Sequence, residues 1–537
     1  MAAETRPRSG RTTGAGTGIA RNTAIFSILT GLSRIAGLVR EVVASSYFGT
    51  SGPFSAFTFA FQVPNLVRSL FADAALSAAF VPVFTELLEK GRRREAFQLA
   101  STFVAIIVAA LTTVTVFFVL VAPVIMPPLT GDFSPQLDDL MVGLSQVLFP
   151  IVLLLGLNGL FVGILNAYDH FTIPALAPLV WNFVIIGVLV ALKPHFHGPN
   201  QMYAYAIGVL AGTVVQLVMC LPVLVRLGFR FELRGVDLHD PRVRQVLTLM
   251  LPITLSLGLI NFDLFINSTI GSTVSDAVPR AIDAAFRLYM LPQGMFSVAV
   301  ATVLFPALAR LATRRDFDGL RALMGTGVRQ IALLLIPAAV CTLVLAEPIT
   351  RLVYQRGAFG TGSTALVSEA LFWFSFSLPF AGINLLLTRT FFSLQRPWLP
   401  TGLAAATLVL NLVLSLVLVG PFGIGGIVFA TAISSAAMTA GQAYYLRREL
   451  SGRLEGYETT RAIARIGLAC VLLAAVSYLV WLALDALLGR SLPAQVISVG
   501  AALSAGIVLY CRAVLRMGVE EAEQISDLVR ARIGRAK

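Results

Sequence analysis

The sequence carries little charge for its length. Asp, Glu, Lys and Arg make up 13% of its 537 residues, about half of the ~25% that is usual in globular proteins. Apolar residues reach 57%, which is more than a water-soluble fold can enclose beneath a polar surface. The scarcity of charge therefore excludes a soluble multidomain protein. It predicts an all-α, polytopic integral membrane protein.

Cysteines and catalytic motifs are also scarce. The four cysteines lie in apolar stretches without the spacing of metal ligands, so we expect neither a disulfide nor a structural metal. The sequence has no GxxxxGK(S/T) loop, no GxSxG, no HExxH and no CxxC, and we expect no catalytic activity and no cofactor. Although the net charge is +12, the basic residues flank apolar segments, so nucleic acid is not the expected partner.

Long apolar runs predict fourteen transmembrane helices. The predicted spans are 22–47, 55–87, 97–122, 140–166, 174–192, 202–225, 246–273, 281–309, 330–350, 364–388, 399–419, 424–446, 466–484 and 492–511. Ala60-Phe61 and Pro82 recur as Ala285-Phe286 and Pro306, which favours two parallel repeats. We expect a basic tail (1–21), an N-lobe (22–225), a linker (226–245), a C-lobe (246–446), two further helices with their preceding loop (447–517) and an amphipathic tail (518–537).

The basic residues predict the orientation. Thirty of the 40 Lys and Arg residues fall in the two tails and in alternate loops, where they mark one side of the membrane. The opposite side receives only Lys193, Arg280, Arg351, Arg356 and Arg490. Basic loops stay in the cytoplasm, so both termini, the linker and the amphipathic tail are predicted to be cytoplasmic.

The remaining basic residues lie inside predicted spans, where charge is costly. They are Arg34, Arg40, Arg68, Arg287 and Arg389, and the acids assigned to spans are Glu41, Asp73 and Asp263. Arg389 is near a span end and is expected to reach the headgroups, whereas Asp263 could hydrogen-bond across helices. One interpretation of the other arginines is structural ion pairing, with Glu41 and Asp73 as the acids. The excess of arginine favours a transporter whose central cavity binds a phosphate-bearing anion.

Several stretches resemble the MurJ (MviN) family of lipid II flippases, within the MOP exporter superfamily. They include SRIAGLVREVVASSYFG (33–49), FQVPNLVRSLFADAALSAAFVPVF (61–84), GILNAYDHFTIPALAP (163–178), FSVAVATVLFPALARL (296–311), LVYQRGAF (352–359) and TRTFFSLQRP (388–397). The resemblance implies two six-helix lobes around a cavity, with two C-terminal helices forming a lipid-facing groove. It also implies a function, the export of undecaprenyl-diphosphate-linked disaccharide pentapeptide for peptidoglycan synthesis across a bacterial plasma membrane.

The same resemblance implies site residues. Arg34, Arg40, Arg68 and Arg287 match the substrate-binding arginines of the family, supported by the cavity charges Glu41 and Asp73. Some relatives bind sodium through acids. The equivalent positions here are Asn267, Asn411, Ser415 and Thr431, which offer oxygens without a carboxylate, so a weak ion site at most is expected. Membrane potential is therefore the expected energy source. Membrane lipids and the cell-wall synthesis machinery are the other expected partners.

Other functions remain open at this point. The chain could be another exporter of the superfamily, for lipid-linked polysaccharide or for drugs, although a drug antiporter would need acids for its cationic substrates. It could also be a non-transporting scaffold of a cell-wall complex, which would not need buried arginines. A glycosyltransferase acting on lipid-linked sugars would need catalytic acids in an outer loop.

Overall fold

The computed structural model describes residues 13–71, 73–131, 133–231, 236–237, 240–450, 454 and 456–535. For residues 13–27, 70–71, 73–79, 249, 251–261 and 528–535 it describes the backbone alone. Within these ranges the regular elements are all helices and no strand occurs. The prediction of an all-α fold is confirmed.

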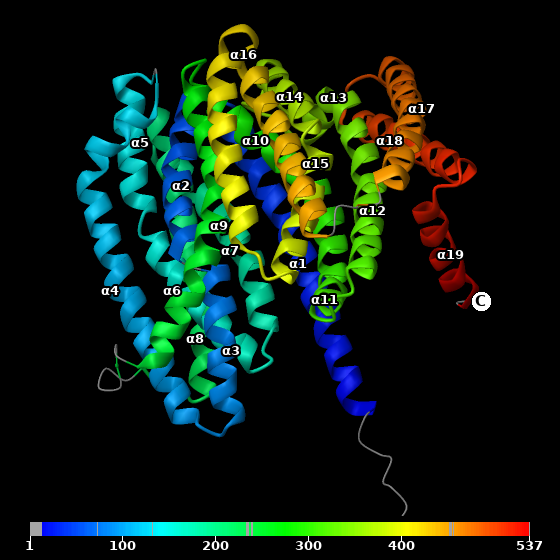
Figure 1. Ribbon diagram of the computed structural model, residues 1–537. Helices are drawn as coiled ribbons and strands as arrows, with labels where there is room; N and C mark the ends of the chain where they lie inside the picture. The colour runs from blue at the N-terminus through cyan, green and yellow to red at the C-terminus, as the bar shows by residue number, and fades with distance from the viewer. Residues whose placement is uncertain are drawn as a thin grey trace, which may run out of the picture. The chain divides into compact units, whose positions relative to one another are not determined.

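The helices follow one another along the chain (Figure 1). In chain order they are α1 (Thr13–Phe48), α2 (Gly52–Phe71), α3 (Asp73–Glu89), α4 (Arg93–Ile125), α5 (Pro135–Leu148), α6 (Ile151–Ala167), α7 (Thr172–Leu192), α8 (Met202–Arg226), α9 (Pro241–Ser272), α10 (Val278–Pro292), α11 (Val298–Thr313), α12 (Phe317–Val344), α13 (Ala346–Tyr354), α14 (Thr361–Ser375), α15 (Leu378–Ser393), α16 (Trp398–Glu449), α17 (Gly456–Leu488), α18 (Leu492–Arg516) and α19 (Glu520–Arg535).

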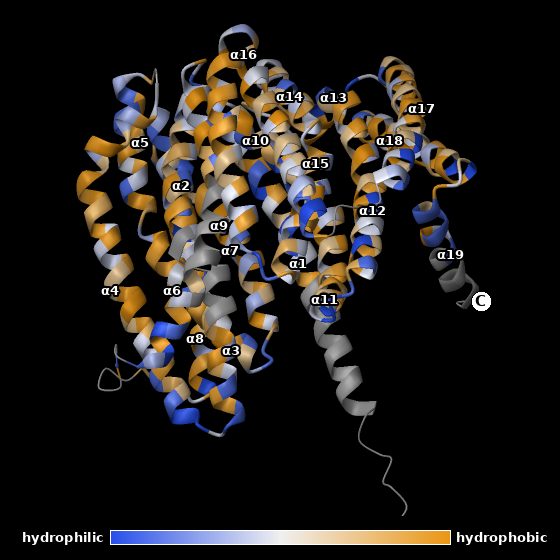
Figure 2. Ribbon diagram, in the orientation of Figure 1, coloured by the Kyte–Doolittle hydropathy of each residue, from blue (hydrophilic) through white to orange (hydrophobic). Residues whose placement is uncertain are grey.

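Every predicted span falls on one of these helices or on a consecutive pair. By length and hydropathy, nine described segments could cross a membrane, with α5–α6 and α10–α11 each counted as one, or ten if the pair α14 and α15, bent by 48°, is one span. Figure 2 shows the hydrophobic residues that run along α4 and its neighbours. The count of fourteen is larger because α16 holds two predicted spans and because α1, α2–α3 and α9 are not among the candidates. It stays a prediction.

Helix α16 shows why two spans were expected there. Its backbone departs from helical geometry at Gly423, where φ is 53° and ψ is −130°, a conformation that glycine adopts without strain. A Cβ on Gly426 would lie 2.1 Å from the carbonyl oxygen of Leu418. The two arms of α16 therefore meet in a sharp break between 418 and 426, where the hydropathy placed a boundary.

The chain divides into two compact units. Unit 1 comprises Met1–Ala44, Ala60–Met126 and Asp139–Leu257, and unit 2 comprises Ser45–Phe59, Pro127–Asp138 and Gly258–Lys537. In unit 1, α3, α4 and α8 pack against α6, and α7 against α8. In unit 2, α12 contacts α11, α14, α15 and α17, and α17 packs against α18. The predicted lobe boundaries stay predictions.

The amphipathic tail forms helix α19, and its first turn lies against the protein. Val519 is 2% exposed in an apolar cluster with residues of α12, α17 and α18. Glu521, also 2% exposed, forms an ion pair with Arg329 of α12. The cluster therefore covers the side chain of Val519, whereas the cytoplasmic location of the tail stays a prediction.

Candidate functional site

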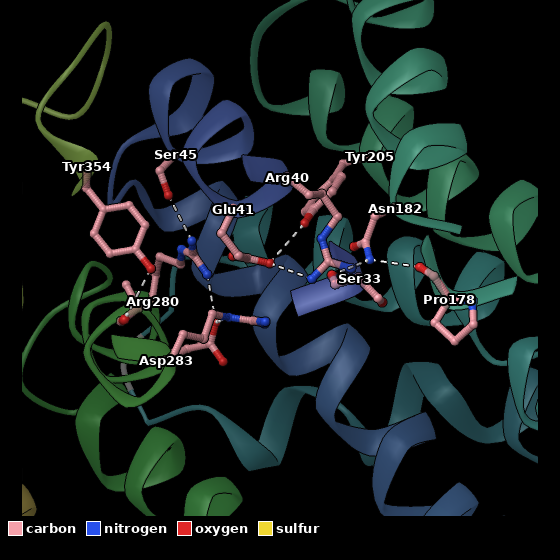
Figure 3. A network of polar contacts seen from close by, with 12 residues as sticks. Ser33, Arg40, Glu41, Ser45, Pro178, Asn182, Tyr205, Arg280, Asp283 and Tyr354 are labelled. Atoms are coloured by element: carbon pink, nitrogen blue, oxygen red, sulfur yellow. Dashed lines mark hydrogen bonds and ion pairs between the residues drawn. The ribbon is translucent and has the colours of Figure 1, made fainter. Parts of the chain in front are cut away.

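Arg40 of α1 is buried in unit 1, and Figure 3 shows it beside the acid Glu41. Its Nη2 donates to Oε1 of Glu41 at 2.8 Å, and the hydroxyl of Tyr205 on α8 donates to the same oxygen at 3.4 Å. The guanidinium carbon lies 4.7 Å from the ring centroid of Trp181 on α7. These contacts fix the side chain in place and compensate its charge, so Arg40 forms the ion pair that structural pairing predicted.

The other two predicted substrate-binding arginines of unit 1 differ from Arg40 in their described contacts, since one is exposed and the other is held by an asparagine. Arg34 is exposed and, in the described part of the chain, makes no hydrogen bond or ion pair. Arg68 is held by Asn65, whose Oδ1 accepts from Nε at 2.9 Å and from Nη2 at 2.8 Å. The side chain of Asp73 lies outside the described residues, so the predicted contact between Asp73 and Arg68 stays a prediction.

In unit 2, Arg287 belongs to an ion-pair network on α10. Oδ2 of Asp283 accepts from Nε of Arg287 at 2.9 Å and from Nη1 of Arg280 at 2.6 Å. Arg280 is 1% exposed. Its Nη2 donates to Oγ of Ser45 at 2.9 Å (Figure 3), and its guanidinium carbon lies 3.8 Å from the ring centroid of Phe54. One carboxylate therefore serves two guanidinium groups.

Two arginines that the sequence places on the less basic side of the membrane are buried. Arg280 and Arg351 are 1% and 4% exposed, and the side of the membrane on which they lie stays a prediction. Each is buried because an acid pairs with it, Asp283 for Arg280 and Asp485 for Arg351. Asp283 was also missing from the acids assigned to spans, although it lies within 281–309. Its spacing of three and four residues from the two arginines was the available signal.

The residues expected to form a weak ion site lie on α9 and α16 of unit 2. Nδ2 of Asn411 donates to Oδ1 of Asn267 at 3.0 Å, and Nδ2 of Asn267 donates to Oγ1 of Thr431 at 3.0 Å. Ser415 is fully buried, and its Oγ has no hydrogen-bond partner among the described residues. Nδ2 of Asn411 also donates to Oδ1 of Asp263 at 2.7 Å. The expectation of a cluster without a carboxylate is therefore wrong, since Asp263 lies one helical turn before Asn267.

The chemistry of this cluster fits a small hard cation. Its carboxylate, amide and hydroxyl oxygens are the ligands that such ions prefer, and the buried Ser415 hydroxyl has an oxygen to offer. In the described part of the chain, no group of three or more His, Cys, Asp or Glu could hold a metal ion. The cluster thus differs from a transition-metal site.

Comparison with known sequences agrees with the family resemblance noted in the sequence. The model of the family described as lipid II flippase MurJ matches residues 44–499. A probable lipid II flippase MurJ of Treponema pallidum is 29% identical over 428 residues, which cover 79% of this chain and 81% of that protein. A probable lipid II flippase MurJ of Rhizobium meliloti is 31% identical over 412 residues, covering 75% of this chain and 76% of that protein.

Solved structures share the fold. A lipid II flippase MurJ in an inward closed conformation superposes with a TM-score of 0.75 at 22% identity, covering 92% of this chain and 99% of that one. An inward-facing multidrug resistance transporter of the MATE family, in the MOP superfamily, gives a TM-score of 0.66 at 14% identity, covering 79% and 94%. At these identities the likeness extends to the fold alone.

Proposed function

Because the chain belongs to the lipid II flippase MurJ family, we propose that it moves lipid II from the inner to the outer leaflet of a bacterial plasma membrane. The substrate is undecaprenyl-diphosphate linked to a disaccharide pentapeptide, and the transport proceeds by alternating access. The observation that carries this proposal is the family match over residues 44–499, which spans most of the helices.

We further propose that Arg34, Arg40, Arg68 and Arg287 bind the diphosphate. A guanidinium group donates two parallel hydrogen bonds to phosphate oxygens and keeps its charge in a dry site. Arg34 supports this role because no described residue pairs with it. Arg287 supports it in another way. Asp283 accepts from Arg287 and Arg280 through one carboxylate oxygen, which positions the guanidinium group of Arg287 on α10.

The supporting residues act by holding these side chains in position. Glu41 pairs with Arg40 and orients it together with Trp181, and Nε of Arg40 has no hydrogen-bond partner among the described residues. Asp73 is proposed to act similarly in unit 1. Membrane lipids and proteins of cell-wall synthesis are further proposed partners.

We propose that the chain has an N-lobe (22–225), a linker (226–245), a C-lobe (246–446) and a C-terminal helix pair (447–517), with both termini in the cytoplasm. The distribution of Lys and Arg supports this orientation. Labelling of single cysteines introduced at Arg94 and at Arg356 tests it. A membrane-impermeant reagent added to intact cells should react at position 356 and not at position 94, and the reverse result contradicts the orientation.

The oxygen cluster around Asn411 is proposed as a weak site for a monovalent cation. Asp263 supports the proposal by supplying the negative charge, with Asn267, Ser415 and Thr431 as further oxygen donors. The test is thermal stability of the purified protein in sodium chloride against choline chloride at equal ionic strength. Sodium should raise the melting temperature of the wild type and not that of Asp263→Asn, and equal responses contradict the site.

The function is tested by reconstituting the protein in vesicles that contain labelled lipid II. Access of an external reagent to the label measures flipping, and a cationic dye in parallel vesicles tests for drug export. Wild-type protein should flip lipid II and leave the dye gradient unchanged. Arg287→Ala should lose flipping, whereas Arg314→Gln, an exposed arginine that pairs with no described residue, should keep it.

A further inference from the structure

A small cavity in unit 1 lies outside the proposed transport residues. Its volume is about 280 Å³, and its lining includes Arg93, Arg94, Arg230, Phe97 and Gly228. Three arginines thus surround one cavity, and no acid is among the described residues that line it. A cavity with this lining favours an anion, and the guanidinium forks suit phosphate oxygens in particular.

Contacts with neighbouring residues fix the position of the Arg93 side chain at this cavity. Its Nη2 donates to the carbonyl oxygen of Leu227, and its guanidinium carbon lies 5.2 Å from the ring centroid of Phe97 and 6.0 Å from that of Tyr168. Gly228 permits this position, because its φ is +76° and a Cβ there would lie 3.2 Å from the same Nη2. None of these contacts neutralises the charge of Arg93.

The guanidinium groups of the other two arginines at the cavity can donate hydrogen bonds to an anion. Arg94 and Arg230 are exposed, and in the described part of the chain they make no hydrogen bond or ion pair. The nearby acid Glu95 is already engaged, since it pairs with Arg92 at 2.5 Å and with Arg242 at 2.9 Å. The charge at the cavity is therefore uncompensated by the described residues.

The position of the cavity indicates where the anion comes from. Helix α4 begins at Arg93 and α8 ends at Arg226, and both are candidate membrane spans. The cavity therefore lies at the level where spans leave the membrane. The rings of Phe97 and Phe229 meet edge to face at 5.5 Å beside it, and aromatic side chains are common at this boundary. Basic pockets at the ends of membrane spans suit anionic lipid headgroups.

We propose that this cavity binds the phosphate of an anionic phospholipid headgroup, with Arg93 as the fixed donor and Arg94 and Arg230 as the groups that close on the phosphate. The site is separate from the transport residues and does not depend on the proposed function. It would anchor the start of α4 and the segment that follows α8 to one lipid molecule.

Native mass spectrometry of the full-length protein in detergent tests the proposal. The probes are phosphatidylglycerol, phosphatidylcholine and inorganic phosphate. The test variant is Arg94→Gln/Arg230→Gln, and the control is Arg314→Gln/Arg448→Gln, which removes two exposed arginines that pair with no described residue. Unchanged melting temperatures without lipid establish that both variants are folded.

We expect wild type and control to bind one phosphatidylglycerol in preference to phosphatidylcholine. The test variant should bind phosphatidylglycerol about 30-fold more weakly, which corresponds to ~1 kcal/mol for each arginine near the membrane surface. Equal weakening in the control would assign the binding to diffuse surface charge. Displacement by equimolar inorganic phosphate would assign the cavity to a soluble anion. Either result, or full binding by the test variant, overturns the proposal.

Discussion

The ion-pair network on α10 makes a quantitative prediction for Asp283→Asn. The substitution keeps the size of the side chain and removes the charge that Arg280 and Arg287 share. Losing one partner of a buried ion pair costs about 3–5 kcal/mol. The lower end, ~3 kcal/mol, is expected because Arg280 keeps its hydrogen bond to Ser45 and its contact with the ring of Phe54.

Two assays separate stability from transport. Thermal unfolding in detergent should show a clear fall in melting temperature for Asp283→Asn. Flipping of lipid II in vesicles should fall about ten-fold at a temperature where the variant is folded. That ratio corresponds to ~1.4 kcal/mol less diphosphate binding once Arg287 is no longer held in place.

A double variant distinguishes positioning from stability. Arg280→Met in the Asp283→Asn background removes the buried guanidinium group that has lost this carboxylate, so at least half of the lost stability should return. Flipping should stay low, because Arg287 still lacks the carboxylate. Wild-type flipping by this double variant would show that Asp283 acts through stability alone. Unchanged stability of Asp283→Asn would refute the assignment of a buried ion pair. Glu347→Gln, at an exposed acid without an ion pair among the described residues, is the matched control.

Three further changes have expected outcomes. Gly426→Val should destabilise the fold by more than about 3 kcal/mol, because the new side chain meets the carbonyl of Leu418; a wild-type melting temperature would contradict the close approach. Glu521→Gln should release α19 by breaking its buried ion pair with Arg329, seen as faster proteolysis of the tail, whereas wild-type resistance would mean that the apolar cluster alone holds it. Collapsing the membrane potential while the sodium and proton gradients are clamped should slow lipid II export. The potential otherwise assists the outward movement of the diphosphate by ~2.3 kcal/mol per charge and 100 mV. Unchanged export together with strict sodium dependence would contradict this.

Sequence patterns predict the helices well because lipid demands long apolar segments with internally satisfied backbones. The break of α16 at Gly423 falls between two predicted spans for that reason. Hydropathy does not reveal that Arg280 is buried, because a hydropathy window registers a buried ion pair as two charges. Only the folded chain brings Ser45 and Phe54 to that arginine.

The candidate site was predictable in part. The residue types and spacing around Arg40 and Glu41 indicated an ion pair, but the ring of Trp181 comes from a helix about 140 positions later in the sequence. The sequence indicated that Asp263 could hydrogen-bond across helices, and it does so with Asn411, but this partner lies 148 positions away and was not identified. Such long-range contacts depend on helix packing, which composition and periodicity do not specify.

The central claim is that arginine side chains bind the diphosphate of lipid II. It is tested most directly by measuring lipid II binding and flipping for Arg34→Lys, Arg40→Lys, Arg68→Lys and Arg287→Lys in the same vesicles. Lysine keeps the charge and loses the bidentate fork. We predict that all four variants fold and that each binds and flips lipid II more weakly than the Arg314→Lys control. Wild-type binding and flipping by all four would contradict direct contact with the diphosphate.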